Sequence, residues 1–146
     1  MKTIINLTDE DKKALDMLTY SETADKLKYT EQRCINFYIA INLIILYYKV
    51  IADLAERFKN FKVNSGYRCK RTNIAVRGHS QSQHIIGCAA DITCNDLSGM
   101  WKTIQNMEVD QAIRHKTYIH VSYVTHRENR NQYIDKTLTE KKGGVK

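Results

Sequence analysis

The sequence contains no proline, no internal repeat and no Gly/Ser-rich linker in its 146 residues. No segment therefore marks a boundary between domains. A chain of this length can bury roughly two-thirds of its unfolded surface around one core. Hydrophobic residues make up 42% and charged residues 27%, an ordinary globular balance. We expect a single domain over residues 1–135 and a flexible basic tail over residues 136–146.

Long apolar segments are also lacking. The first residues run straight into the acidic cluster Asp9–Asp11 and leave no apolar stretch long enough for a signal peptide. We therefore expect synthesis in a cytoplasm without Sec export. The most apolar run, residues 35–48, falls short of the roughly 20 residues that a bilayer requires. We interpret it as a buried helix and predict no membrane span.

Paired cysteine motifs are absent as well. None of the four cysteines stands in a CxxC spacing, which excludes a zinc-knuckle pattern and gives no disulfide framework. We predict free, buried thiols at Cys34, Cys69, Cys88 and Cys94.

Acidic residues are too few to balance the basic ones. Lys and Arg number 23 against 16 Asp and Glu, so the net charge is +7 and attraction to a polyanion is expected. That polyanion is either nucleic acid or an anionic cell wall, unless the charge serves only solubility. No basic helix, zinc finger or aromatic RNA-binding motif is present, so nucleic acid is the weaker choice.

The order of predicted elements indicates an α+β fold. Thr8 followed by acidic residues is typical of a helix N-terminus, and apolar residues recur at helical spacing in the middle of the chain. The pattern predicts helices over about 9–18, 31–59 and 97–107, with a shorter one from Ser21, and strands over 62–68, 89–93 and 118–123.

Three side chains form a candidate zinc site: His84, Asp91 and His120. A catalytic zinc takes three protein ligands of imidazole or carboxylate type and leaves one position open. Strand alternation puts His120 on the face opposite Ile119 and Val121, away from the core. Spacing alone does not make this set specific, because a lone histidine is more often structural.

Three motifs, in order, add that specificity. They are SGYR at Ser65–Arg68, SQHIIGCAADI at Ser82–Ile92 and YIHVSY at Tyr118–Tyr123, with Asn129 and Arg130 behind them. Together they resemble the zinc D-Ala-D-Ala carboxypeptidase family, whose pattern is S-G-Y-R, S-x-H-x-x-G-x-A-x-D and a last W-x-H strand. The resemblance covers residues 17–130 and is closest to the short versions found in phages and prophages.

The resemblance implies the hedgehog/DD-peptidase fold, a small antiparallel sheet flanked by helices with the metal in a groove across it. It implies that Zn²⁺ is held by His84, Asp91 and His120. Arg68 matches the family arginine that anchors substrate or stabilises the oxyanion; the alternative is a surface salt bridge. Ser82 matches a serine that binds substrate or supports the metal loop; the alternative is a plain turn residue.

The sequence departs from the family at the general base. The family places Glu or Asp shortly before the last histidine, whereas residues 114–119 contain no carboxylate and His115 stands in that position. An imidazole with a pKa near 6.5 can act as a base at neutral pH. Other candidates are Glu108, Asp110 and His79, and the remaining alternative is that catalysis has been lost.

These observations give two functional expectations. The first is a zinc-dependent peptidase, either a carboxypeptidase or an endopeptidase, acting on peptidoglycan peptide stems, with His115 and Arg68 as catalytic residues. The second is a catalytically impaired member that binds the cell wall or forms part of a virion. In both, the resemblance implies a phage-encoded protein that acts at the bacterial wall or in a phage particle.

Overall fold

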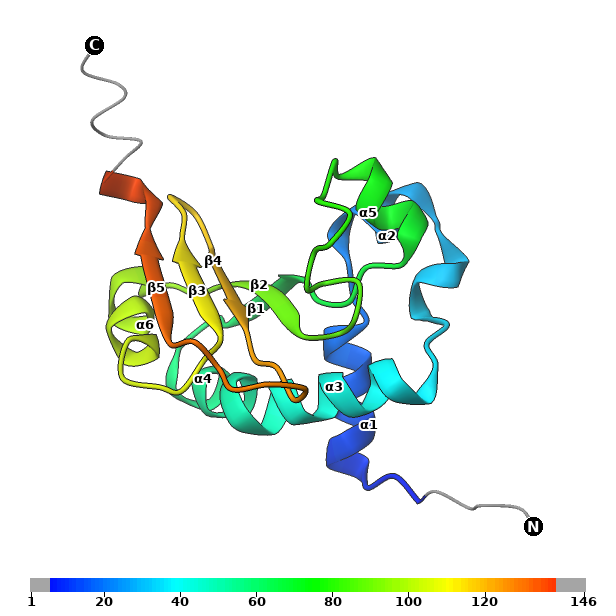
Figure 1. The fold of residues 1–146 in the computed structure, drawn as a ribbon, viewed down its shortest axis with the longest axis horizontal. Helices are drawn as coiled ribbons and strands as arrows, with labels where there is room; N and C mark the ends of the chain where they lie inside the picture. Colours follow the sequence, from blue (N-terminus) through cyan, green and yellow to red (C-terminus); the bar gives the residue numbers. More distant parts are fainter. Residues whose placement is uncertain (1–5, 139–146) are drawn as a thin grey trace.

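The fold is described by a computed structural model over residues 6–138 (Figure 1). Residues 139–146, the greater part of the predicted tail, lie outside the described residues, and residues 136–138 are helical. The first two predicted helices are confirmed as α1 (Asp9–Leu18) and α2 (Glu22–Leu27). Thr8 caps α1 because its Oγ1 accepts a hydrogen bond from the Asp11 N–H at 3.0 Å.

The long helix begins later than predicted. It starts at Phe37 instead of Glu31, because Asn36 caps it and Asn36 Oδ1 accepts a hydrogen bond from the Ile39 N–H at 2.9 Å. Residues Thr30–Arg33 form a separate 3-10 turn. The helical stretch runs through α3 (Phe37–Leu46), a π-helical segment (Tyr47–Ile51) and α4 (Ala52–Arg57).

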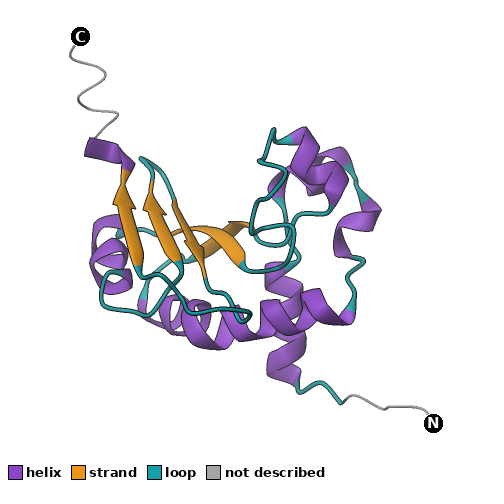
Figure 2. Cartoon of the chain, in the orientation of Figure 1, coloured by secondary structure: helices purple, strands orange, loops and turns teal. Residues whose placement is uncertain are grey.

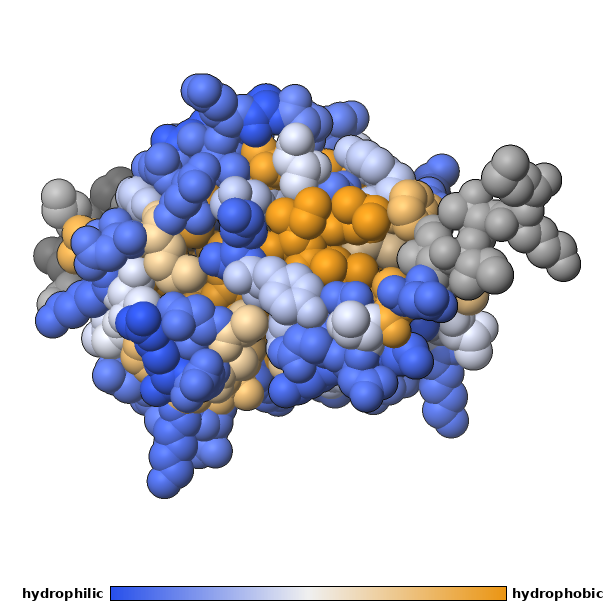
Figure 3. Space-filling model, turned by 90° about the horizontal axis from the view of Figure 1, so that it is seen from below, coloured by the Kyte–Doolittle hydropathy of each residue, from blue (hydrophilic) through white to orange (hydrophobic). Residues whose placement is uncertain are grey.

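This stretch, Phe37–Arg57, spans 21 residues and is long and apolar enough to cross a membrane by length and composition alone. The sequence argument that the apolar stretch is too short to cross a bilayer was therefore wrong. A core helix passes the same test, and the fully buried side chains of this stretch are those of a core helix: Leu43, Leu46, Tyr47, Val50, Ile51 and Leu54. Its outer side leaves apolar side chains exposed, and Figure 3 shows apolar residues gathered on the underside of the molecule. The exposed large side chains of the stretch are Phe37, Tyr38, Ile41 and Tyr48.

The sheet has five strands in the order β1-β2-β4-β3-β5. They are β1 (Lys62–Ser65), β2 (Ala89–Thr93), β3 (Gln111–Arg114), β4 (Ile119–Ser122) and β5 (Gln132–Asp135). The three predicted strands are confirmed, and β3 and β5 are additions. The sheet is antiparallel, as expected, except that the unpredicted strand β5 pairs parallel with β3.

One face of the sheet carries the core. Val63, Ile92, Ala112, Ile119 and Val121 pack there against the long helix and α6. The predicted helix at 97–107 is α6 (Leu97–Ile104), and α5 (Lys70–Ala75) was not predicted. Figure 2 shows α5 and α2 grouped beside the sheet, at the opposite end from β5. The α+β class, a sheet flanked by helices, is confirmed.

We predict that Asn36→Ala destabilises the fold by about 1 kcal/mol, because the N-cap acceptor of the main core helix is lost. Asn36→Asp is the matched control: it keeps the acceptor and adds negative charge at the positive end of the helix. Urea unfolding measures both. Equal losses in the free energy of unfolding for the two variants would show that the cap does not contribute to stability.

Candidate metal centre

Two strands and one loop bring three candidate ligands together. Asp91 on β2 and His120 on β4 are direct cross-strand partners, so their side chains share the face opposite the core. His84 comes from the loop before β2. One ligand atom from each of the three residues lies within 4.8 Å of the other two. The structure thus assembles the three residues predicted as metal ligands.

The spacing of these atoms fits a zinc ion. His84 Nε2 is 3.2 Å from His120 Nδ1 and 3.2 Å from Asp91 Oδ1. His120 Nδ1 is 3.1 Å from the same Asp91 oxygen. A tetrahedral zinc with bonds of about 2.0–2.1 Å separates its ligand atoms by about 3.3 Å. Two imidazoles and one carboxylate also leave the fourth position open, as catalytic zinc sites do.

The tautomer of His84 suits metal binding. Its Nδ1 donates a hydrogen bond to the Gly66 carbonyl at 2.7 Å, which leaves the lone pair of Nε2 directed at the cluster. Burial lowers the pKa of His84, so the ring stays neutral. Gly66 is required at this point, because a Cβ there would lie 2.1 Å from the Leu18 carbonyl oxygen.

The loop that carries His84 is held by its own turn. Ser82 Oγ accepts a hydrogen bond from the His84 N–H at 3.2 Å, and the Gln83 carbonyl accepts one from the Cys88 N–H at 3.0 Å. Gly87 has a φ of 79°, which other residues adopt only with strain. Ser82 thus contacts the backbone of a candidate ligand, and its predicted role in binding substrate stays a prediction.

The two carboxylate oxygens of Asp91 contact different partners. Oδ1 faces the histidines, and Oδ2 accepts a hydrogen bond from Arg68 Nη2 at 3.1 Å. Burial alone would raise the pKa of Asp91. The hydrogen bond from His120 opposes this effect, and the pKa of Asp91 lies far below the usual range. The carboxylate is therefore ionised, which is the form that binds a metal.

Arg68 is fixed by three side chains. Besides Asp91, its Nε donates to Ser65 Oγ at 3.2 Å and its Nη1 donates to Asn73 Oδ1 at 3.4 Å. The Arg68 side chain is only 13% exposed. It forms an ion pair with a candidate metal ligand, so the alternative of a surface salt bridge does not hold. The guanidinium orients Asp91 from the side away from the histidines.

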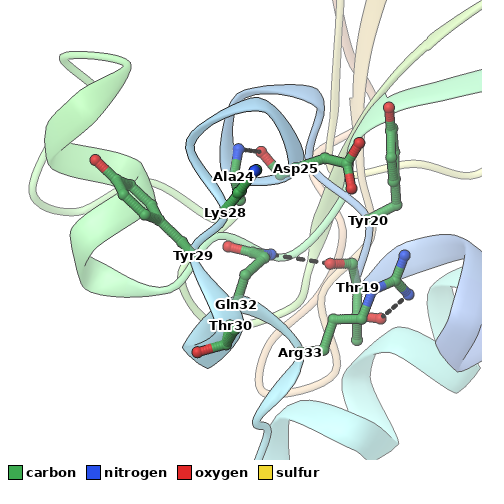
Figure 4. Close-up of a pocket in the computed structure, with 10 residues that line it drawn as sticks. Thr19, Tyr20, Ala24, Asp25, Lys28, Tyr29, Thr30, Gln32 and Arg33 are labelled. Carbon is green, nitrogen blue, oxygen red and sulfur yellow. Dashed lines mark hydrogen bonds between the residues drawn. The ribbon is translucent and has the colours of Figure 1, made fainter.

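Gln32 supports the backbone on both sides of Arg68. Its Nε2 donates to the carbonyls of Thr19, at 3.0 Å, and Tyr67, and its Oε1 accepts from the Cys69 N–H at 3.0 Å. Gln32 lines a pocket of about 330 Å³ formed by α2 and the 3-10 turn (Figure 4). The sequence carries no signal for this role, because the three partners lie 13, 35 and 37 residues away from Gln32 along the chain.

Asp110, one of the predicted alternatives for the base, is not available for that role. Its side chain is 0% exposed, and Arg127 Nη1, Arg130 Nη2 and Gln83 Nε2 donate to its oxygens at 2.6, 2.8 and 2.8 Å. Burial would raise its pKa, but the bonds from Arg127, Arg130 and Gln83 hold the pKa well below the usual range. Asp110 instead ties the loop of His84 to the loop after β4.

His115 lies on the metal-bearing face but outside the three-residue cluster. Its ring stacks on Tyr118, with the ring centroids 4.4 Å apart and the planes 14° apart. The backbone N–H of His115 donates to the Tyr118 carbonyl at 2.9 Å. Because Ile113 pairs with His120, alternation puts His115 and Tyr118 on the face of His120. The remaining alternatives, Glu108 and His79, are exposed and are not part of the cluster.

The cysteines take no part in the cluster. All four are free, which confirms that prediction. Burial was predicted for all of them and holds for Cys69 and Cys88; Cys34 is exposed and Cys94 is intermediate.

Comparison with known families gives one finding. Residues 16–125 match a family described as Peptidase M15. The matched span is more than half of the chain and contains the three clustered residues, Arg68 and His115. No curated protein matches the chain.

We predict that the purified protein binds one zinc per chain and that His84→Ala loses it, because one of three ligands is removed. His79→Ala, an exposed histidine before the same loop, is the control and retains zinc. Elemental analysis after dialysis gives the stoichiometry. Equal zinc in the two variants would contradict the assignment of His84.

We predict that Asp110→Asn destabilises the fold by about 1.5–3 kcal/mol at neutral pH, because the buried side chain loses its charge-assisted hydrogen bonds from two half-exposed arginines. The folded-state pKa of Asp110 lies below the unfolded value near 3.9. Its contribution is therefore full above about pH 4 and is lost as the pH falls through the folded-state pKa. Denaturant unfolding at several pH values should show that the free energies of unfolding of Asp110→Asn and wild type converge below about pH 4. The exposed control Asp25→Asn should stay close to wild type at every pH.

Proposed function

Because this chain belongs to the peptidase M15 family, we propose that it hydrolyses a peptide bond in peptidoglycan stems. The family consists of zinc-dependent peptidases, and peptidoglycan is the expected substrate. The observation that carries the proposal is the convergence of His84, Asp91 and His120 on one point beside a fixed arginine. The proposal covers both a carboxypeptidase and an endopeptidase.

Zinc is held in this proposal by His84 Nε2, His120 Nδ1 and Asp91 Oδ1. When bound, zinc supplies a Lewis acid for the scissile carbonyl and lowers the pKa of water toward neutrality. The protein supports this chemistry in two ways. The Gly66 carbonyl orients His84, and Arg68 orients Asp91. Both contacts keep the ligand set in place before substrate arrives.

Arg68 serves the substrate as well as Asp91 in this proposal. Its guanidinium is held at three points and remains partly exposed, at 13% of its side chain. A planar, permanently charged donor held against the candidate ligand Asp91 suits either the oxyanion that forms at the scissile carbonyl or a carboxylate of the substrate. Little reorganisation is then required when negative charge develops.

His115 is the general base and acid in this proposal. It lies on the metal-bearing face, and its stacking on Tyr118 fixes the plane of its ring. A neutral imidazole can take a proton from the attacking water. It then returns the proton to the leaving amine, which completes general acid–base catalysis.

The second candidate function is a wall-binding or virion component without catalysis. The observation in its favour is that His115 replaces the family carboxylate and that Asp110 is occupied by arginines. Loss of the base slows such reactions by roughly 100- to 10,000-fold. In this case the site would hold the stem peptide without cleaving it.

We further propose that the protein is phage-encoded and acts at the bacterial cell wall or within the virion. The net charge of +7 supports attraction to an anionic wall. Binding to purified walls that weakens steeply between low and high salt would support this attraction, and binding insensitive to salt would remove it.

We predict that the zinc-loaded protein releases new fragments from purified peptidoglycan, detected by mass spectrometry. His115→Ala should lower the rate by roughly 100-fold or more, because general acid–base catalysis contributes at least that much. His115→Glu, which restores the family residue, should retain activity. Exposed His126→Ala is the control for a surface histidine.

The outcomes separate the two functions. Fragments that depend on zinc and on His115 establish the peptidase. Bound zinc with wall binding and no fragments identifies the non-catalytic component. Full activity in His115→Ala would place the base elsewhere.

A further inference from the structure

The cross-strand row that contains the metal ligands continues toward the far edge of the sheet. Asp91 on β2 pairs with His120 on β4, His120 pairs with Ile113 on β3, and Ile113 pairs with Ile134 on β5. Neighbouring strands lie about 4.8 Å apart, and residues in one such row share a face. Two aliphatic side chains therefore follow His120 directly, in line with the cluster.

These two isoleucines do not serve the core. Their chain neighbours Ala112 and Tyr133 belong to the core or pack against it, as strand alternation requires. Ile113 and Ile134 are only partly buried and are not members of the core cluster. They form a partly exposed aliphatic strip beside the candidate metal centre. We call Ile113 and Ile134 the aliphatic strip.

The opposite end of the same row is polar and charged. Ser65 on β1 pairs with Asp91, and Arg68 donates hydrogen bonds to both of them. The row therefore changes from a fixed guanidinium at the β1 end, through the cluster, to the aliphatic strip at the β5 end. A substrate that lies along this row meets a cation on one side of the metal and hydrocarbon on the other.

Two glutamines and two aromatic rings border the strip on the same face. Gln111 and Gln132 are its neighbours on one side and hydrogen bond to each other at 2.7 Å. His115 and Tyr118 lie on the other side. Asp135 pairs with Arg114, so both belong to the opposite face of the sheet. A charged substrate side chain over the strip would lose water against two aliphatic side chains, which offer it no hydrogen bond.

We propose that Ile113 and Ile134 form a specificity subsite for an uncharged aliphatic side chain of the peptide substrate, on the side of the scissile bond away from Arg68. The inference rests on the proposed peptidase function and adds a substrate class and an orientation to it. An anionic substrate group then lies toward Arg68 and an aliphatic side chain toward β5. Each methylene buried over the strip favours binding by about fourfold.

The test uses a set of synthetic peptides that differ only at the residues flanking the cleaved bond, which carry Ala, Val, Glu or Lys. The wild type should prefer the aliphatic peptides over both charged ones by at least about tenfold in kcat/KM. Ile134 is the residue to change, because β5 is an edge strand and the side chain is partly exposed. Ile134→Lys should shift the preference toward the Glu peptide, and Ile134→Glu should shift it toward the Lys peptide.

A purely structural role of Ile134 would not shift the substrate preference in opposite directions in the two variants. Ile74→Thr, at a side chain that is 67% exposed on α5, is the matched control and should keep the wild-type ranking. The same ranking in both charged Ile134 variants would overturn the subsite. If either variant failed to fold, Ile134→Thr would replace it and should lose only the preference for Val over Ala.

Calorimetric binding of the same peptides to zinc-loaded His115→Ala separates this inference from the proposed function. Aliphatic peptides that bind without being cleaved by the wild type would keep the subsite and remove the peptidase. Cleavage by the wild type with no preference among the peptides would keep the peptidase and remove the subsite. Absence of both binding and cleavage would overturn both.

Discussion

The candidate centre depends on how one buried carboxylate is shared. Asp91 Oδ1 meets both histidines, while Oδ2 accepts a hydrogen bond from Arg68. A charge this deeply placed is tolerated only when it is paired, and two of its three partners are held by further contacts. His84 is fixed by the Gly66 carbonyl, and Arg68 is fixed by Ser65 and Asn73. The orientation of the ligand set therefore follows from contacts that do not involve the metal.

The rest of the fold holds these contacts from two directions. The N-terminal segment supports the SGYR motif: the carbonyls of Leu18 and Tyr20 accept hydrogen bonds from Tyr67 and Gly66, and Gln32 bridges the backbone around Arg68. From the other side, Asp110 joins the loop of His84 to the loop after β4. These ties explain why a small sheet with four- and five-residue strands can hold three ligands at short range.

The sequence predicted the parts of this arrangement that depend on local pattern. Thr8 and Ser21 were correct helix caps, and alternation placed His120 away from the core. The long helix begins at Phe37, later than predicted, because the Asn36 side-chain cap sets its start and the apolar pattern begins before that cap. Strands β3 and β5 were missed because each holds two adjacent apolar residues, Ala112–Ile113 and Tyr133–Ile134, instead of an apolar–polar alternation. The tasks of Gln32 and Asp110 arise from contacts between distant segments, which no local pattern records.

X-ray absorption at the zinc edge of the loaded protein would show directly whether His84, Asp91 and His120 hold the metal. The account predicts one zinc with nitrogen and oxygen ligands at about 2.0–2.1 Å and outer-shell scattering from two imidazoles. In Asp91→Asn the oxygen contribution should weaken while both imidazoles remain. Sulfur ligands at about 2.3 Å, or a chain that holds no stoichiometric zinc, would contradict the account.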